Sequence, residues 1–158
     1  MPKLRLISCS VVVAAIFYLS NQPASQSGAM SLVLTENILL LVEKILPGMD
    51  LTANGIHNSL RKTAHFFIFL LLGLLMMSLV KSMEIRSITA AVVALGICMV
   101  LAVLDETHQY FIEGRSAEMR DVVIDSLGAV VGIALYSVLR TVFRFFKKKE
   151  EIDLQLDK

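Results

Sequence analysis

The chain has 158 residues, of which 56% are hydrophobic and only 18% are charged, and its formal net charge is +1. Together with a mean hydropathy of +0.70, this composition is too apolar for a soluble domain and predicts an integral membrane protein. The near-neutral net charge gives no indication of a nucleic-acid partner. We expect membrane lipids as partners, and no nucleic acid. Internal repeats are absent, so we expect residues 1–158 to form a single domain.

Four apolar runs approach the length of about 20 residues that a bilayer-spanning helix needs. The first run also resembles a signal peptide, because Lys3 and Arg5 precede it. We expect it to be retained, since no persuasive cleavage site follows and its loss would leave an odd number of spans. We therefore predict an all-α fold, an integral membrane four-helix bundle, with spans at residues 4–19, 64–80, 88–104 and 122–142.

A shorter amphipathic pattern lies between the first two spans, at residues 35–46. Glu36, Glu43 and Lys44 fall on one helical face against a broad apolar surface, and Pro47 ends the pattern. The segment is too short to cross a bilayer, so we predict an extra extracytoplasmic amphipathic helix. It either packs in the interface plane or covers the mouth of the bundle as a lid, and the sequence leaves both alternatives open.

The distribution of basic residues predicts the orientation, because short cytoplasmic segments are enriched in lysine and arginine. Both termini are expected in the cytoplasm, although the opposite segments also carry some basic residues. The span ends that carry His65, Asp105 and Asp121 should then meet at the outer surface. The basic residues assigned to the cytoplasmic side are Lys3, Arg5, Lys81, Arg86, Arg140, Arg144, Lys147, Lys148 and Lys149.

Charged residues open the second span. Arg61 and His65 stand four residues apart, so they share a helical face. Arg61 and Lys62 are placed to anchor the helix end at lipid phosphates. His65 lies about one turn further into the apolar run, where an ionisable residue is costly and needs a partner. A purely structural hydrogen bond to another helix is the alternative interpretation of His65.

The densest group of polar residues lies where the third span ends. Asp105, His108 and Gln109 share a helical face, with Glu106 beside it. Arg115, in the connection that follows, is suited to hold a phosphate or a carboxylate through two parallel hydrogen bonds. The two acids are expected to pair with nearby cations or with a protonated histidine. A salt-bridge network that only locks helix ends together would use the same residue types.

The fourth span opens with two acids and continues with small residues on the same stripe. Asp121 and Asp125 stand four residues apart, and Gly128 and Gly132 follow. Small residues let neighbouring helix backbones approach closely, so we interpret the glycines as structural. They would carry both acids toward the interior of the bundle, and Asp125 is the harder of the two to explain as a surface charge.

Taken in this order, these motifs resemble the VanZ-like family of bacterial membrane proteins, named for a protein associated with low-level teicoplanin resistance. The resemblance covers residues 58–136 and rests on combined order and spacing, whereas residues 21–56 carry no motif of the family. It implies a location in the bacterial cytoplasmic membrane and a link to glycopeptide resistance or the cell envelope, but no particular reaction. The motifs are KTAHFFIF at 62–69, Gly73, DETHQYF at 105–111, GRS at 114–116, DVVID at 121–125, Gly128 and Gly132.

Three functions compete at this stage. The first is an envelope-protection protein that alters or shields outer targets of glycopeptides, and the second is a membrane enzyme acting on a lipid-linked phosphate or sugar. The third is a small transporter or proton relay, for which four spans are few. The candidate catalytic residues are His65, Asp105, Glu106, His108, Gln109, Arg115, Asp121 and Asp125, and the candidate substrate-binding residues are Arg61, Lys62 and Arg115.

Under the enzyme hypothesis, each group has a role. Arg61 and Arg115 hold the anion, Glu106 or His65 acts as general base or acid, and the aspartates orient them or bind a divalent cation. The carboxylate-rich set suits Mg²⁺ or Mn²⁺ better than Zn²⁺, but no spacing is diagnostic, so we assign no cofactor. The expected partner is a membrane lipid or a lipid-linked component of the cell envelope.

Overall fold

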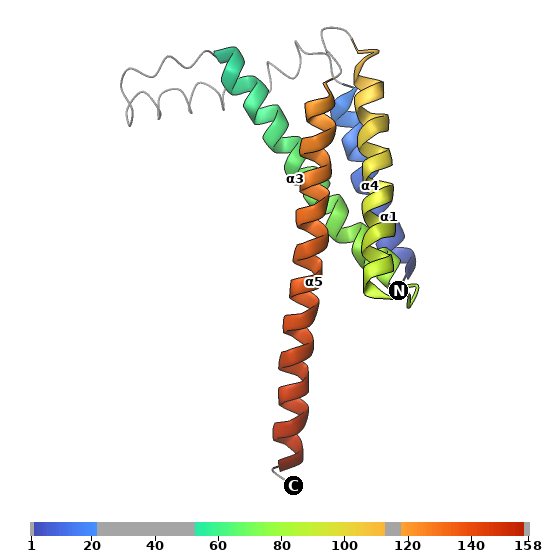
Figure 1. Ribbon diagram of the computed structural model, residues 1–158, viewed down its shortest axis with the longest axis vertical. Helices are drawn as coiled ribbons and strands as arrows, with labels where there is room; N and C mark the ends of the chain where they lie inside the picture. Colours follow the sequence, from blue (N-terminus) through green and yellow to red (C-terminus); the bar gives the residue numbers. More distant parts are fainter. Residues whose placement is uncertain (1, 22–52, 113–117, 157–158) are drawn as a thin grey trace, which may run out of the picture.

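The computed structural model describes residues 2–21, 53–112 and 118–156, and within these ranges every regular element is an α-helix (Figure 1). α1 covers Pro2–Ser20, α3 Ala53–Lys81, α4 Ser87–Gln109 and α5 Met119–Leu156. All four helices are long and apolar enough to cross a membrane. The predicted all-α fold with four spanning helices is therefore confirmed, and the protein is a multi-pass membrane protein. The amphipathic helix predicted at residues 35–46 lies outside the described residues.

Each helix extends beyond the apolar run that predicted it. α4 continues through Gln109, so the acids that follow the third span lie in its last turns. α5 begins at Met119, which places Asp121 and Asp125 in its first two turns. Hydropathy marks only the lipid-facing length of a helix, whereas the backbone hydrogen bonds continue into the polar residues at its end.

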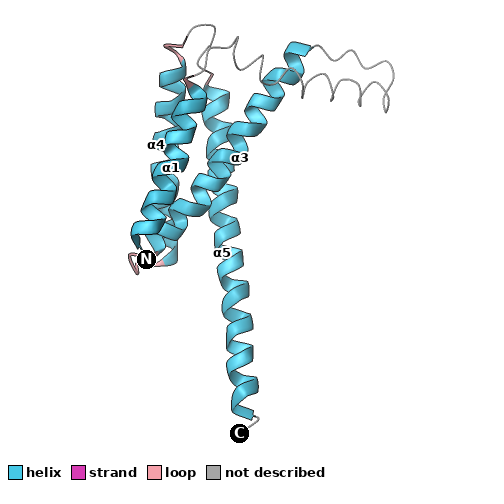
Figure 2. Ribbon diagram, turned by 180° about the vertical axis from the view of Figure 1, so that it is seen from behind, coloured by secondary structure: helices cyan, strands magenta, loops and turns pink. Residues whose placement is uncertain are grey.

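α3 and α4 form the centre of the bundle, and α1 and α5 lie on either side of them. The two central helices contact each other and both flanking helices, whereas α1 and α5 do not contact each other within the described ranges. α5 is much the longest helix, and its C-terminal half projects beyond the bundle (Figures 1 and 2). At about 1.5 Å per residue it is roughly 57 Å long, well beyond a hydrocarbon core of about 30 Å.

The helices alternate in direction, which gives the bundle two distinct ends (Figure 1). At the polar end, which we define by Ser20, Gln109 and Met119, α1 and α4 finish and α5 begins. At the turn end, a short connection joins α3 to α4, and Glu84 in this connection has a φ of 62°. There the Arg5 side chain donates a hydrogen bond of 3.0 Å to the carbonyl of Ser78, which ties α1 to α3.

Glycines set the close crossing of α3 and α5. A methyl group added at Gly128 would collide with the carbonyl oxygen of Phe66, and one added at Gly132 would collide with that of Leu70. From the opposite side, a methyl group at Gly73 would meet the backbone of Ala129. The interpretation of Gly128 and Gly132 as packing residues agrees with these contacts, and the close approach brings His65, which precedes Phe66, beside the start of α5.

The buried face of α4 changes character along its length. From the turn end it consists of small apolar residues spaced four apart, and at the polar end it consists of polar ones. Small side chains allow α4 to pack tightly against its neighbours, while large apolar residues such as Val92 and Val100 point outward, where lipid would cover them. The buried residues of α4 are Ala90, Ala94, Cys98, Ala102, Asp105, Glu106 and Gln109.

Candidate functional site

The buried polar side chains of the described residues gather at the polar end. The interior toward the turn end is apolar, with Phe69, Leu72 and Cys98 fully buried in it. An ionisable group inside a membrane is costly and requires compensation, so a concentration at one end is the expected place for a site. The buried polar or charged residues are Ser20, Asp105, Glu106, Gln109, Asp121 and Asp125.

Three residues from three helices form the innermost part of this group, which we call the histidine–carboxylate cluster: His65, Asp105 and Asp125. The Nδ1 atom of His65 lies 3.7 Å from Oδ2 of Asp105 and 3.6 Å from Oδ2 of Asp125. The two carboxylates are 0% and 1% exposed and the imidazole 15%. Neither oxygen of Asp125 has a hydrogen-bond partner among the described residues, and the same holds for Oδ1 of Asp105 and Nδ1 of His65.

Gln109 holds Asp105 in position from the next turn of α4. Its side-chain amide donates a hydrogen bond of 2.8 Å to Oδ2 of Asp105 and one of 3.4 Å to the hydroxyl of Ser20. An amide nitrogen has two hydrogens, so it satisfies both acceptors at once. The last residue of α1 is thereby linked to the cluster, and the orientation of Asp105 depends on the packing of α1 against α4.

Next to the cluster lies a second set of charges, which we call the ion-pair group: Arg61, Lys62, Glu118 and Asp121. The Lys62 ammonium lies 2.8 Å from Asp121 and 2.9 Å from Glu118, and the Arg61 guanidinium lies 3.2 Å from Asp121. Asp121 is nearly buried, whereas Glu118 is 43% exposed. The group therefore runs from the bundle interior toward the surface, with Glu118 at its outer edge.

Glu106 lies beside both sets and is buried. One of its carboxylate oxygens, Oε1, accepts a hydrogen bond from the backbone N–H of Glu118. The other oxygen, Oε2, has no hydrogen-bond partner among the described residues. A carboxylate with one anchored and one unpartnered oxygen is well placed to accept or donate a proton.

The structure brings most of the sequence-predicted site residues together. His108 is half-buried, and its ring lies against the edge of Phe17 of α1 at a centroid distance of 6.0 Å. Gln109 also contacts α1, through Ser20, so both residues face that helix. Arg115 lies outside the described residues.

Sequence reasoning missed two members of the site, Glu118 and Ser20. Glu118 directly precedes α5 and lies three residues before Asp121, so extension of the helical spacing by one residue would have placed it near that acid. Ser20 carries no comparable signal, because its contact with Gln109 depends on how α1 packs against α4.

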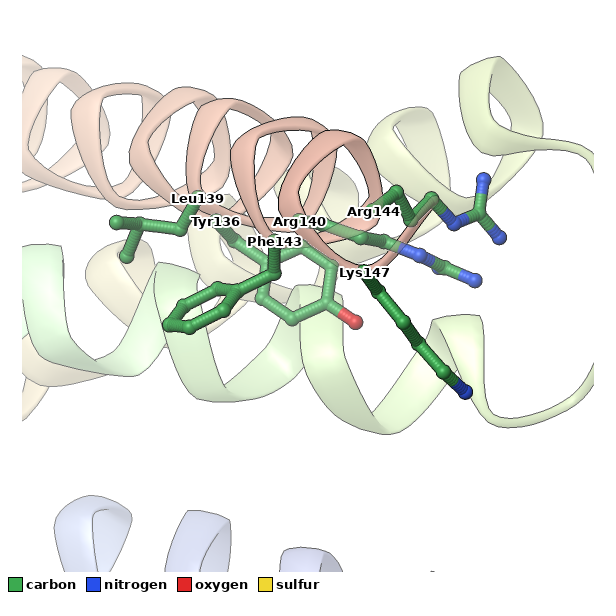
Figure 3. Close-up of a pocket in the computed structure, with 6 residues that line it drawn as sticks. All are labelled: Tyr136, Leu139, Arg140, Phe143, Arg144 and Lys147. Carbon is green, nitrogen blue, oxygen red and sulfur yellow. The ribbon is translucent and has the colours of Figure 1, made fainter. Parts of the chain in front are cut away.

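A separate groove of about 480 Å³ runs along the C-terminal half of α5 (Figure 3). Tyr136, Arg140, Phe143 and Lys147 are among its lining residues, and Figure 3 shows that its labelled side chains all come from this one helix. Tyr136 is about 16 Å along the helix axis from Asp125 at about 1.5 Å per residue. The groove combines apolar and basic side chains, which suits contact with lipid, and it contains none of the buried acids.

Fold and site together define a multi-pass helical membrane protein with a histidine and several carboxylates buried at one end of its bundle. The family model of VanZ/LLP1 matches residues 6–140, which is most of the chain, and the chain belongs to this family. The resemblance drawn from the motifs is therefore confirmed. Comparison with curated proteins found no match, and comparison with solved structures found none either.

Proposed function

We propose that this protein modifies a lipid-linked, phosphate-bearing component of the bacterial cell envelope and thereby lowers susceptibility to lipophilic glycopeptides such as teicoplanin. The proposal is carried by the position of His65 between the buried carboxylates of Asp105 and Asp125, one helical turn from Arg61. Ionisable groups inside a membrane are costly and mark functional positions. Here, groups that transfer protons lie beside groups that bind anions.

The burial of the acids favours chemistry over passive shielding. A shield that repels or masks an antibiotic needs charge at the surface, where the antibiotic meets it. Asp105 is 0% exposed and Asp125 is 1% exposed, so neither presents charge to the outside. Burial of a charge without full compensation weakens folding. A protein that retains such carboxylates at this cost is expected to use them in a reaction.

The apolar interior argues against a proton relay across the membrane. A relay needs polar groups on both sides of the bilayer core, connected in steps of hydrogen-bond length. Within the described residues, the interior between the cluster and the turn end is formed by apolar side chains such as Leu72, Met76 and Cys98. The buried polar side chains of the described residues are confined to one end, which suits a reaction at a single face.

In the proposed reaction, the ion-pair group binds the phosphate. Arg61 and Lys62 already hold carboxylates, and a phosphate would share these cations with Asp121 and Glu118. We place Arg115 as a further ligand of the phosphate. An attacking hydroxyl gives its proton to Glu106 or His65 and bonds to phosphorus, while the bond to the departing oxygen breaks and that oxygen takes up a proton.

We further propose that the polar end faces outward from the cytoplasmic membrane, with both termini in the cytoplasm. Lys81 and Arg86 flank the turn between α3 and α4, and Arg5 lies at the same end. Short cytoplasmic segments are enriched in such residues. With this orientation the cluster meets the leaflet in which lipid-linked envelope intermediates are exposed to glycopeptides.

The test is teicoplanin susceptibility in a sensitive bacterial host that produces the wild type, Glu106→Gln or His65→Gln at equal membrane abundance. Glu84→Gln is the matched control, because Glu84 is an exposed carboxylate at the turn end. We expect protection by the wild type and by Glu84→Gln and loss of protection in the other two variants. A lipid profile of the same cells should show a product that depends on Glu106 and His65.

The outcomes separate the candidate functions. Equal protection by all variants would favour passive shielding and overturn the proposed chemistry. Protection that depends on Glu106 without any change in lipids would also overturn it. Absence of protection by the wild type would remove the link to glycopeptide resistance, and the lipid profile would then decide whether a reaction takes place.

A further inference from the structure

We propose that the histidine–carboxylate cluster is a binding site for one divalent transition-metal ion, with Mn²⁺ as the best match. The ligands are Nδ1 of His65 and one carboxylate oxygen each of Asp105 and Asp125. Ligand atoms of these three residues lie within 4.8 Å of one another, and they come from α3, α4 and α5. This inference goes beyond the proposed function, because binding of the ion requires no substrate.

The balance of charge at the cluster calls for a cation. Two carboxylates are fully buried, and His65 supplies at most one positive charge. Among the described residues, Arg61 and Lys62 pair with Asp121 and Glu118, and neither Asp105 nor Asp125 forms an ion pair with a lysine or arginine. A divalent ion bound to a neutral imidazole balances both carboxylates, whose burial is otherwise strongly unfavourable.

Unpartnered ligand atoms point to the same place. Both oxygens of Asp125 lack a hydrogen-bond partner although the side chain is 1% exposed, and Oδ2 faces Nδ1 of His65 at 3.6 Å. Nδ1 of His65 and Oδ1 of Asp105 also lack a partner. A metal ion with bonds of about 2.1 Å holds neighbouring ligand atoms roughly 3.0–3.4 Å apart. The spacings of 3.6 and 3.7 Å from Nδ1 of His65 to the two carboxylate oxygens need a contraction of a few tenths of an ångström. The two carboxylates, whose oxygens lie within 4.8 Å of each other, would close around the ion.

The donor set selects the class of ion. Carboxylates alone favour Mg²⁺ or Ca²⁺, whereas an imidazole nitrogen shifts the preference toward transition metals, and Mn²⁺ accepts both kinds of ligand. Gln109 fixes Asp105 by a hydrogen bond, as residues behind a metal ligand usually do. With His65 bound to the ion, Glu106 is left as the group that transfers protons in the proposed reaction, and this last step alone rests on the proposed function.

The experiment uses full-length protein in detergent, freed of metal with a chelator and titrated with Mn²⁺ under electron paramagnetic resonance. We expect one tightly held ion per chain and, by electron spin echo modulation, coupling to a nitrogen nucleus. Asp125→Asn and His65→Gln should each weaken binding by about tenfold or more. Glu84→Gln, at the turn end, should bind as the wild type does, and circular dichroism should show that every variant tested remains helical.

Three results would overturn the metal site. The first is absence of Mn²⁺ binding by the wild type, and the second is binding without nitrogen coupling, which would exclude His65 as a ligand. The third is unchanged affinity in both cluster variants. If one cluster variant fails to fold, the Mn²⁺ affinity of the other variant and the nitrogen coupling of the wild type together still test the site. Binding of the ion without any lipid product would leave the metal site standing while the proposed function fails.

Discussion

The Nδ1 atom of His65 on α3 lies 3.6 Å from Oδ2 of Asp125 on α5. This contact depends on the close crossing of the two helices, because Phe66, the residue after His65, lies against Gly128 of α5. A side chain larger than hydrogen at Gly128 would separate the backbones and carry the imidazole away from the carboxylate. The geometry of the cluster therefore depends on how closely α3 packs against α5.

The first prediction concerns Gly132, which lies four residues further along the same crossing. Gly132→Ala should destabilise the protein by about 1–3 kcal/mol, because the new methyl group would collide with the carbonyl oxygen of Leu70 and force the helices apart. The measurement is the thermal unfolding midpoint of the purified protein in detergent. Mn²⁺ affinity should fall as well, since α3 and α5 both contribute to the cluster.

Gly96 provides the matched control, because it is also a helical glycine but, among the described residues, a methyl group added there would meet no atom within 4 Å beyond its own stretch of helix. Gly96→Ala should leave the unfolding midpoint unchanged or raise it, since alanine favours a helix by about 0.5–1 kcal/mol over glycine. Equal changes in the two variants would show that the crossing of α3 and α5 is not limited by backbone contact.

The second prediction separates the two acids of the ion-pair group. Asp121→Asn should cost about 1–3 kcal/mol, because Asp121 is 8% exposed and its loss leaves Arg61 and Lys62 without their inner partner. Glu118→Gln should cost about 0–1 kcal/mol, because Glu118 is 43% exposed and water replaces it. The measurement is the thermal unfolding midpoint of each variant at one salt concentration. A larger loss of stability from Glu118→Gln than from Asp121→Asn would contradict the prediction.

The sequence was sufficient to predict the spanning helices and most members of the site. Hydropathy locates apolar runs directly, and a spacing of four residues places Asp121 above Asp125 and Arg61 above His65 on their helices. Alternating helix direction then brings the polar ends of α3, α4 and α5 together. These predictions need only local periodicity and the order of the spans, which the amino-acid sequence contains.

The sequence could not predict which acid pairs with which cation, because the pairing depends on how each helix is rotated about its own axis. Asp105 and Glu106 were both candidates to pair with the cations, yet Arg61 and Lys62 bind Asp121. His108 shows the same limit, because helical spacing places it near Asp105 on α4 but does not tell that its ring meets Phe17 of α1. The rotation of α3 and α5 is fixed by the backbone contacts at Gly128 and Gly132, and the rotation of α4 by its contact with α1.

The third prediction concerns Gln109, which joins α1 to the cluster. Gln109→Leu should destabilise the protein by about 1–3 kcal/mol and weaken Mn²⁺ binding, because Asp105 and Ser20 both lose a buried hydrogen bond. Thr107→Val is a control in the same turn of α4, since among the described residues the Thr107 hydroxyl bonds only to the carbonyl of Val103 on its own helix. The test compares the unfolding midpoints and Mn²⁺ affinities of the two variants. Equal losses in Gln109→Leu and Thr107→Val would contradict the role of Gln109 in positioning Asp105.

The fourth prediction concerns orientation in the membrane. Met83 in the turn between α3 and α4 and Tyr110 at the end of α4 are 68% and 67% exposed, so cysteines at these positions should be equally accessible within the fold. Both are introduced after the buried native cysteines, Cys9 and Cys98, have been replaced by alanine.

Because basic residues are retained on the cytoplasmic side, a maleimide that cannot cross the membrane should label Tyr110→Cys in intact cells. It should label Met83→Cys only after the cells are permeabilised. Labelling of Met83→Cys alone in intact cells would reverse the orientation and place the cluster in the inner leaflet. The substrate would then have to be a lipid-linked phosphate on the cytoplasmic face, and protection against an external glycopeptide would require that the product be moved outward before it acts.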